Sequence, residues 1–147
     1  MEKYYVNLFK EEFPSRPLLE GMNFDRISNQ EKILLELPFS EEEVRKMIFN
    51  MKGDKTPGPD GFTISFFQNC WEIVKVDLLK VFEEFHELEE FYSHLTNTFI
   101  ALIPKKSNAT ELKDFRPISL LSSVYKIIVK VLMSRLKSVM KNIISQP

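Results

Sequence analysis

Short apolar patterns at helical spacing, separated by prolines, fill the first 38 residues. Residues 1–13 predict a short amphipathic helix whose apolar face holds Tyr4, Tyr5, Leu8 and Phe9. The prolines of residues 14–17 end this helix, because proline fixes φ and has no backbone N–H to donate. Residues 18–30 predict a turn, and residues 31–37 predict a further helical turn that stops at Pro38.

The clearest helical pattern covers residues 40–51. Ser40 can accept a hydrogen bond from the free amides of the first turn, and Glu43 three residues later completes a capping box. Phe39 and Val44 stand at the positions of a hydrophobic staple. One apolar stripe follows, made by Val44, Met47, Ile48 and Met51.

A second helical pattern covers residues 63–88, and aromatic residues dominate its first half. A break is expected near residues 75–77, with Asp77 capping the second half. Aromatic side chains at this density predict a buried core rather than a surface for stacking bases. Cys70, the single cysteine, shares this apolar face with Trp71 and is expected to be an inert core residue.

Residues 98–103 are β-branched, aromatic and apolar on both faces, which predicts a buried strand that ends at Pro104. A polar turn at residues 107–110 separates it from a second apolar stretch at 114–120, which is expected to pair back on the first. The resulting hairpin would carry Lys105 or Lys106, together with Arg116, near its open end.

Residues 124–144 predict a long helix. At 100° per residue, its lysines fall within a sector of about 60°, and the rest of the circumference is mostly aliphatic. A row of ammonium groups on one face suits a phosphate backbone; the alternative is a solvated face that keeps the helix soluble. The row consists of Lys126, Lys130, Lys137 and Lys141.

Turn chemistry is concentrated between the two long helical patterns of the first half. Residues 53–62 hold three glycines and two prolines, and Gly53 is where the preceding helix is expected to stop. We interpret this segment as a structured loop that aims two helices and the basic C-terminal region around a groove. The alternative is that it serves only as a connector.

The net charge of −1 hides a strong asymmetry. Residues 1–97 hold 11 Lys and Arg against 19 Asp and Glu, whereas residues 98–147 hold 9 against 2, so the two parts carry −8 and +7. A basic C-terminal third favours a polyanion as partner; the alternative is that the two parts neutralise each other by packing. The composition is that of a soluble globular protein, and no apolar run is long enough to span a bilayer, so we expect no membrane partner. A single cysteine cannot form an internal disulfide, so a reducing intracellular compartment, nucleus or cytoplasm, is the simpler assumption.

No catalytic constellation stands out in the sequence. His86, Glu90 and His94 have a spacing that could place metal ligands on one helix face, but they stand where the helix is expected to fray, so an exposed helix end is the preferred interpretation. Asp54 and Asp60 could be imagined as a metal pair, although aspartates in such loops usually cap turns. We therefore expect neither a catalytic nor a metal site.

Four ordered stretches resemble the opening motifs of non-LTR (LINE-type) retrotransposon reverse transcriptases, most closely those of the plant branch. The stretches are 55–62 (KTPGPDGF), 98–106 (TFIALIPKK), 114–120 (DFRPISL) and 125–132 (YKIIVKVL). Residues 1–38, with Arg16–Glu20 and Ile27–Ser28, look like the segment just upstream of the polymerase in the same proteins. The resemblance thus covers nearly the whole chain.

The resemblance implies an α+β, mostly helical fold, the fingers subdomain of a reverse transcriptase, in which a short antiparallel hairpin packs on helices. It divides the chain into an upstream helical segment, 1–38, and the N-terminal fingers part, 39–147. It also implies contacts with the incoming nucleotide's triphosphate or with the template. The residues assigned to these contacts are Lys55, Asp60, Lys105, Lys106, Arg116, Lys126, Lys130 and Lys137.

The same resemblance implies that catalysis is missing from this chain. Polymerases of this family hold two Mg²⁺ ions on palm carboxylates, and no aromatic-x-Asp-Asp sequence occurs here. We therefore expect a fragment, truncated before the palm, that binds RNA template or an RNA–DNA hybrid weakly, needs the palm as partner, and requires no cofactor by itself. Two alternatives remain open: a helical protein-interaction module with no nucleic-acid role, and an active enzyme with an unrecognised site.

Overall fold

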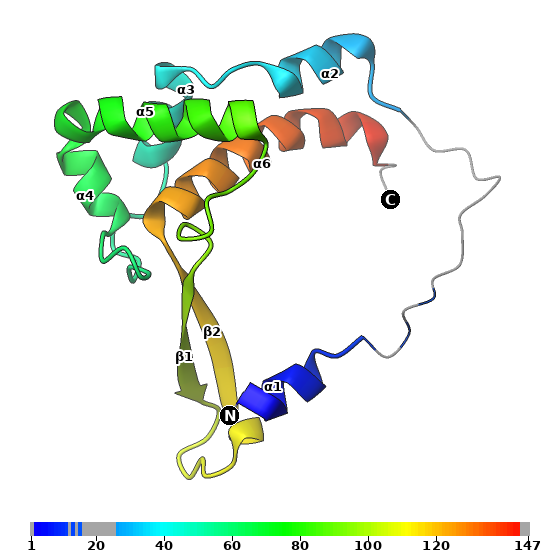
Figure 1. The fold of residues 1–147 in the computed structure, drawn as a ribbon, viewed down its shortest axis with the longest axis vertical. Helices are drawn as coiled ribbons and strands as arrows, with labels where there is room; N and C mark the ends of the chain where they lie inside the picture. Colours follow the sequence, from blue (N-terminus) through cyan, green and yellow to red (C-terminus); the bar gives the residue numbers. More distant parts are fainter. Residues whose placement is uncertain (1, 12, 14, 16–25, 145–147) are drawn as a thin grey trace. The chain divides into compact units, whose positions relative to one another are not determined.

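The computed structural model describes residues 2–11, 13, 15 and 26–144 (Figure 1). The predicted ends and turns at residues 14 and 16–25 lie outside these described residues. The chain divides into two compact units, one of residues 1–24 and Ala101–Ile118, the other of residues 25–100 and Ser119–Pro147. In chain order the elements are α1 (Glu2–Leu8), α2 (Asn29–Glu36), α3 (Glu41–Phe49), α4 (Ile64–Asn69), α5 (Trp71–Leu88), β1 (Thr98–Pro104), a 3-10 turn η1 (Leu112–Asp114), β2 (Phe115–Leu121) and α6 (Ser123–Ile143).

The predicted α+β, mostly helical class is confirmed: the described residues form mainly helices, together with a single two-stranded antiparallel sheet. The predicted helices and strands are present, and most lie within a few residues of their expected bounds. The exceptions are α1, which ends at Leu8 rather than near residue 13, and the division of residues 63–88. The boundary predicted at residue 38 stays a prediction.

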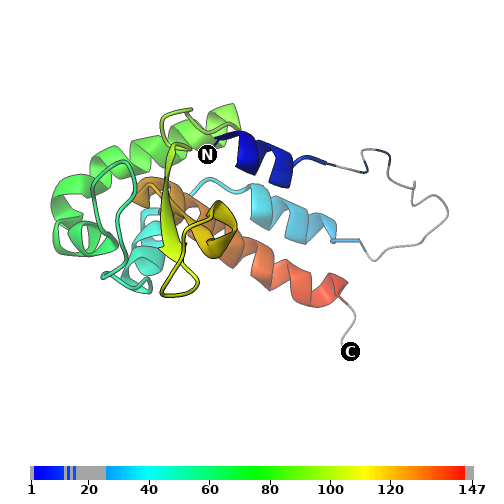
Figure 2. The same ribbon diagram turned by 90° about the horizontal axis from the view of Figure 1, so that it is seen from below.

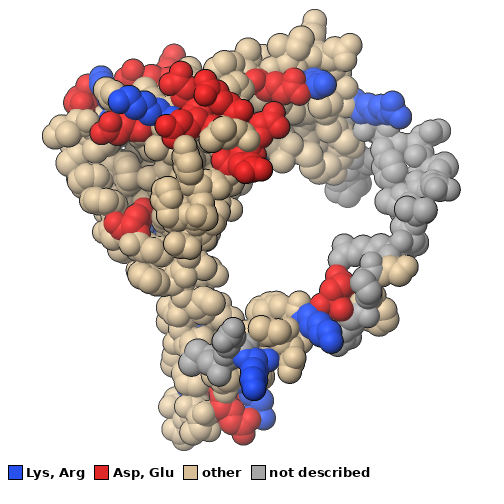
Figure 3. All heavy atoms as spheres, in the orientation of Figure 1, with Lys and Arg blue, Asp and Glu red and all other residues tan. Residues whose placement is uncertain are grey.

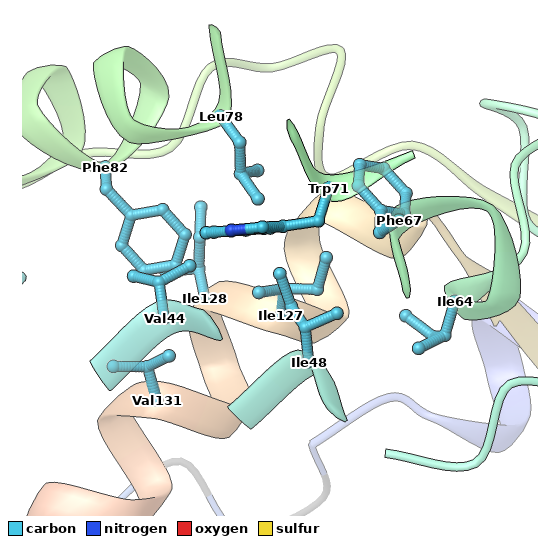
Figure 4. Close-up of a cluster of buried hydrophobic side chains, with 10 residues drawn as sticks. All are labelled: Val44, Ile48, Ile64, Phe67, Trp71, Leu78, Phe82, Ile127, Ile128 and Val131. Atoms are coloured by element: carbon cyan, nitrogen blue, oxygen red, sulfur yellow. The ribbon is translucent and has the colours of Figure 1, made fainter. Parts of the chain in front are cut away.

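The core of the second unit lies between α3, α4, α5 and α6 (Figure 4). Helix α3 contacts α4, α5 and α6, so it stands at the centre of this arrangement. Each fully buried aliphatic or aromatic side chain contributes about 1.5–3 kcal/mol when it leaves water. The buried cluster consists of Val44, Ile48, Ile64, Phe67, Trp71, Leu78, Phe82, Ile127, Ile128 and Val131.

Local capping explains where the two helices before the loop begin. Ser40 Oγ accepts from the Glu43 amide at 3.2 Å, as predicted. The predicted capping box is nevertheless incomplete, because both carboxylate oxygens of Glu43 bind Arg135 instead. A complete box forms at α2, where Ser28 Oγ accepts from the Glu31 amide at 3.2 Å and the Ser28 amide donates to Glu31 Oε2 at 2.7 Å.

The helix break predicted near residues 75–77 is wrong. Helix α5 runs without interruption from Trp71 to Leu88, and the break falls at Cys70, between α4 and α5. The physical reason is a tertiary contact: Gln68 Nε2 donates to the carbonyls of Ile48 and Met51, both at 2.9 Å, and ties α4 to the end of α3. Asp77 is an exposed residue within α5 rather than its cap.

The prediction that residues 98–103 form a buried strand is also wrong. Phe99 and Ile100 point to opposite faces of β1 because successive side chains alternate, yet they are 58% and 59% exposed. Two strands alone provide no second layer to cover either face, and no residue of the hairpin belongs to the described core cluster.

Helix α2 lies along the second half of α6, as both ribbon views show (Figures 1 and 2). Among the described helices, none combines the length and the apolar character needed to cross a membrane.

Candidate functional site

The glycine- and proline-rich loop is anchored on the N-terminal end of α6. A Cβ atom added to Gly58 would lie 2.2 Å from the carbonyl oxygen of Leu121, so only glycine allows the loop to approach this closely. Asp60 Oδ2 accepts from the Ser123 amide at 2.5 Å, and Ser123 Oγ donates to the Phe62 carbonyl at 2.5 Å. The Asp60 carboxylate thus stands at the positive end of the α6 dipole.

Ser122 completes this junction. Its Oγ accepts from the Tyr125 amide at 3.3 Å and donates to the carbonyl of Leu95 at 2.9 Å. Ser122 and Ser123 are both buried, at 3% and 1% exposure. The loop and the start of α6 are therefore held in a fixed relation, although they are about 60 residues apart in the sequence.

This anchoring creates a pocket of about 480 Å³ between the end of α3, the loop and α6. Four lysines line it, and no carboxylate is among its lining residues. Two of the lysines come from the loop side, Lys52 and Lys55, and two from α6, Lys126 and Lys130. The remaining lining residues are Asn50, Met51, Thr56, Ile64 and Leu120.

The charges of this lysine pocket are uncompensated. None of its four lysines forms an ion pair with a described residue; Lys126 Nζ donates to the Thr56 carbonyl, at 3.1 Å. Figure 3 shows many acidic side chains over α5, whose sequence includes Glu72, Asp77, Glu83, Glu84 and Glu87. The lysine pocket gathers four ammonium groups with no carboxylate in its lining, which favours binding of an anion there.

The eight residues predicted to bind nucleotide or template fall into three groups. Lys55, Lys126 and Lys130 meet in the lysine pocket. Asp60 anchors the loop, and Lys137 is exposed further along α6, outside the pocket lining. The other three, Lys105, Lys106 and Arg116, belong to the first unit and are not among the pocket-lining residues.

These three residues lie beside the connecting loop of the hairpin, so the prediction that placed them near its open end is wrong. Lys105 Nζ donates to the Lys113 carbonyl at 2.6 Å. Lys106 Nζ pairs with Asp114 Oδ1 at 2.9 Å. Arg116 is exposed at the start of β2.

Asp114 organises the hairpin loop. Its Oδ2 accepts from the amides of Thr110 and Glu111, both at 3.4 Å, while its Oδ1 holds Lys106. The hydrogen bond from Lys106, together with those backbone amides, lowers the pKa of Asp114 below its ordinary value. The carboxylate is therefore ionised at neutral pH and fixes one of the lysines beside it.

Sequence reasoning missed two basic residues. Lys52 belongs to no motif, and its place just after the predicted helix suggests only a solvated charge. The fold alone shows that it lines the pocket. Arg135 is almost buried, with 11% of its side chain exposed, and binds Glu43 Oε2 at 2.7 Å. Arg135 also donates to the carbonyls of Leu35, Leu37 and Pro38, and its guanidinium lies 4.2 Å from the centre of the Phe39 ring.

The described residues contain no group of three or more His, Cys, Asp or Glu side chains that could hold a metal ion. The spacing of His86, Glu90 and His94 does not translate into a helix face, because α5 ends at Leu88 and Glu89 adopts a left-handed φ of 55°. Asp54 and Asp60 belong to no such group either, and Asp60 Oδ2 accepts a hydrogen bond from the Ser123 amide.

The chain matches no protein-family model. It is 34% identical over 143 residues to the "Transposon TX1 uncharacterized 149 kDa protein" of Xenopus laevis. The alignment covers 96% of this chain and 11% of that protein, so the chain spans about a tenth of its relative's length. The similarity relates the chain to a transposon protein.

Proposed function

We propose that the chain is the fingers part of an RNA-directed DNA polymerase of the non-LTR retrotransposon type, and that its lysine pocket binds the phosphate backbone of a single-stranded RNA template. The four ordered motifs and the similarity to a transposon protein support the family. Two of these motifs, the loop 55–62 and the helix segment 125–132, meet where Lys126 Nζ donates to the Thr56 carbonyl.

One observation carries the proposal: a concave surface lined by four lysines and no carboxylate. Each ammonium is a compact, mobile point charge with three donors, which suits phosphate oxygens. Because no described acid pairs with these lysines, binding a polyanion would not have to break existing ion pairs.

The hairpin supplies a second basic group in this proposal. Lys105, Lys106 and Arg116 would contact the triphosphate of an incoming nucleotide or the template itself. Arg116 is exposed and can offer its planar donor fork to a phosphate. Lys105 and Lys106 are already oriented by the Lys113 carbonyl and by Asp114.

The Mg²⁺ chemistry of such polymerases does not fit the described residues, since they provide no converging set of carboxylates. In our proposal the metal ligands belong to a palm region that docks on this chain. The isolated chain then binds RNA but forms no phosphodiester bond. Mg²⁺-dependent incorporation of nucleotides by the purified chain would contradict this part of the proposal.

The test is RNA binding as a function of salt. We expect a single-stranded RNA of about 12 nucleotides to bind with an affinity that falls linearly in a plot of log K against log salt, between about 50 and 300 mM KCl. Neutralising Lys55 and Lys130 together (Lys55→Gln with Lys130→Gln) should flatten the slope by about 1.4, at about 0.7 per phosphate contact on a single strand. Fluorescence anisotropy measures both quantities.

The matched control is Lys80→Gln, which removes an exposed lysine of α5 on the acidic side of the unit. It should leave the slope unchanged. Absent binding, salt-independent binding, or an equal effect of the Lys80 and the pocket variants would overturn the proposal.

A further inference from the structure

The lysine pocket has an apolar wall that phosphate groups alone would not use. Met51, Ile64 and Leu120 form this wall, alongside the ammonium groups. Ile64 is 2% exposed and belongs to the core, so it supports the wall, while the half-buried Met51 and Leu120 offer the accessible apolar surface. The volume of about 480 Å³ far exceeds what one phosphate group needs and lies within the range of small-molecule sites.

We propose that the pocket holds one whole nucleotide of the RNA strand, with the base turned inward against the apolar wall and the flanking phosphates on the lysines. This inference rests on the proposed function and specifies what the same site binds. A pocket that combines an apolar surface with convergent cations matches the two chemical halves of a nucleotide.

The geometry assigns distinct roles to the lining residues. Lys52 and Lys55 come from the loop side and Lys126 and Lys130 from α6, so phosphates on either side of the inserted nucleotide find ammonium donors. Asn50 lines the same pocket, and its amide carries both donors and an acceptor for a base edge.

Lys126 has a further role as a positioning residue. Its Nζ donates to the Thr56 carbonyl and thereby holds the loop over the pocket, while its remaining N–H donors stay available for a phosphate. Insertion of a nucleotide and fixation of the loop are therefore coupled through this side chain.

Aliphatic walls accept any base, since they contact its flat apolar face rather than its hydrogen-bonding edge. The inserted nucleotide is therefore expected to show little sequence preference, apart from a modest advantage of purines, which bury more area.

The test compares an RNA trimer carrying three adenines with the same trimer whose central nucleotide lacks its base. Both have the same phosphates, so any difference reports on the base. We expect removal of the central base to weaken binding about fivefold to tenfold. In methyl NMR spectra of the intact chain, the signals of Met51, Ile64 and Leu120 should shift with the full trimer. They should not shift with inorganic tripolyphosphate, which occupies only the lysines.

A further titration with free AMP tests whether the site needs the flanking phosphates of a strand. Methyl shifts with AMP would show that the pocket accepts a nucleotide without neighbours. Methyl shifts with the trimer but not with AMP would show that the flanking phosphates are needed. Equal affinities of the two trimers, or methyl signals that stay fixed while the trimer binds, would overturn the inference and leave backbone binding intact. Loss of all RNA binding, including that of the longer strand, would instead overturn the proposed function.

Discussion

At the scale of single residues, Arg135 connects α6 to α3 and to the end of α2. It forms two hydrogen bonds to Glu43, at 2.8 and 2.7 Å, and donates to one carbonyl in the last turn of α2 and to two between α2 and α3. Only arginine combines a planar fork for a carboxylate with further donors for carbonyls and a flat face for Phe39. Arg135 therefore holds the entry to α3 against α6.

Replacing Arg135 by alanine should destabilise the chain by about 2–3 kcal/mol, because it leaves the Glu43 carboxylate and the carbonyls without their donor. Lysine at this position keeps the charge but loses the fork, so it should recover only part of the loss. Urea unfolding followed by circular dichroism measures both free energies. A double variant with Glu43→Gln should cost less than the sum of the two single changes, and strict additivity would contradict a direct coupling.

Two glycines of the loop allow a matched comparison. Gly58→Ala would place a Cβ 2.2 Å from the Leu121 carbonyl, whereas a Cβ on Gly61 meets nothing within 4 Å and suffers only from its φ of +71°. We expect Gly61→Ala to cost about 1 kcal/mol and Gly58→Ala clearly more, with loss of RNA binding because the loop leaves α6. Equal effects in thermal unfolding and RNA binding would show that the close approach at Gly58 has no role.

At the scale of elements, local signals in the sequence predict most of the secondary structure but not its environment. Caps and apolar periodicity located α3 and α6 to within a few residues. Burial of β1 was mispredicted, because an apolar strand does not reveal whether anything covers it. The break at Cys70 was missed for a related reason: it depends on Gln68 reaching carbonyls 17 and 20 residues away in the sequence.

In the candidate site too, local signals predict some of the residues, and the rest depend on contacts between distant segments. The motifs singled out Lys55, Lys126 and Lys130, and these residues do meet. Lys52 lies in no recognisable motif. It lines the pocket only because the loop meets α6, at the hydrogen bond between Lys126 and Thr56, two residues that are 70 positions apart in the sequence. The partnership of Arg135 with Glu43 spans 92 residues and leaves no local trace in the sequence.

The hairpin loop depends on the charge of Asp114. Hydrogen bonding to Lys106 and to two amides lowers the pKa of Asp114 below 3.8. A carboxyl group whose pKa is lowered by folding stabilises the folded form above its unfolded pKa, and this contribution is lost as the pH falls through the lower folded value. Acidification to below the ordinary pKa of aspartate should therefore release the loop.

The amide signals of Thr110 and Glu111 report on this release, because both donate to Asp114 Oδ2. They should titrate together at a pH below 3.8, the ordinary pKa of aspartate. Asp114→Asn should abolish the titration, whereas Glu111→Gln should preserve it. A midpoint at or above the ordinary value would contradict the role of Lys106.

At the scale of the whole molecule, stability and the candidate pocket reside in the same unit. Every residue that lines the pocket, and every member of the described core cluster, lies within residues 25–100 or 119–147. The first unit contributes the end of the hairpin and its basic residues, but no residue of the core cluster. The two groups of cations should therefore be separable by deletion.

Register identifies where to make that deletion. The Lys105 amide donates to the Asp114 carbonyl at 2.8 Å, and counting back along both strands places Ala101 opposite Ile118. Replacing residues 102–117 by Asn-Gly, which favours a two-residue hairpin turn, should close the shortened strands. The variant should keep the helical circular dichroism and cooperative unfolding of the full chain, because its core is intact. The shortened variant should also keep pocket-dependent RNA binding, which is the salt-dependent part of the binding that is lost when Lys55→Gln and Lys130→Gln are combined. Loss of cooperative unfolding would show that the hairpin contributes to the core after all, and loss of pocket-dependent binding in a folded variant would show that the two basic groups act as one site.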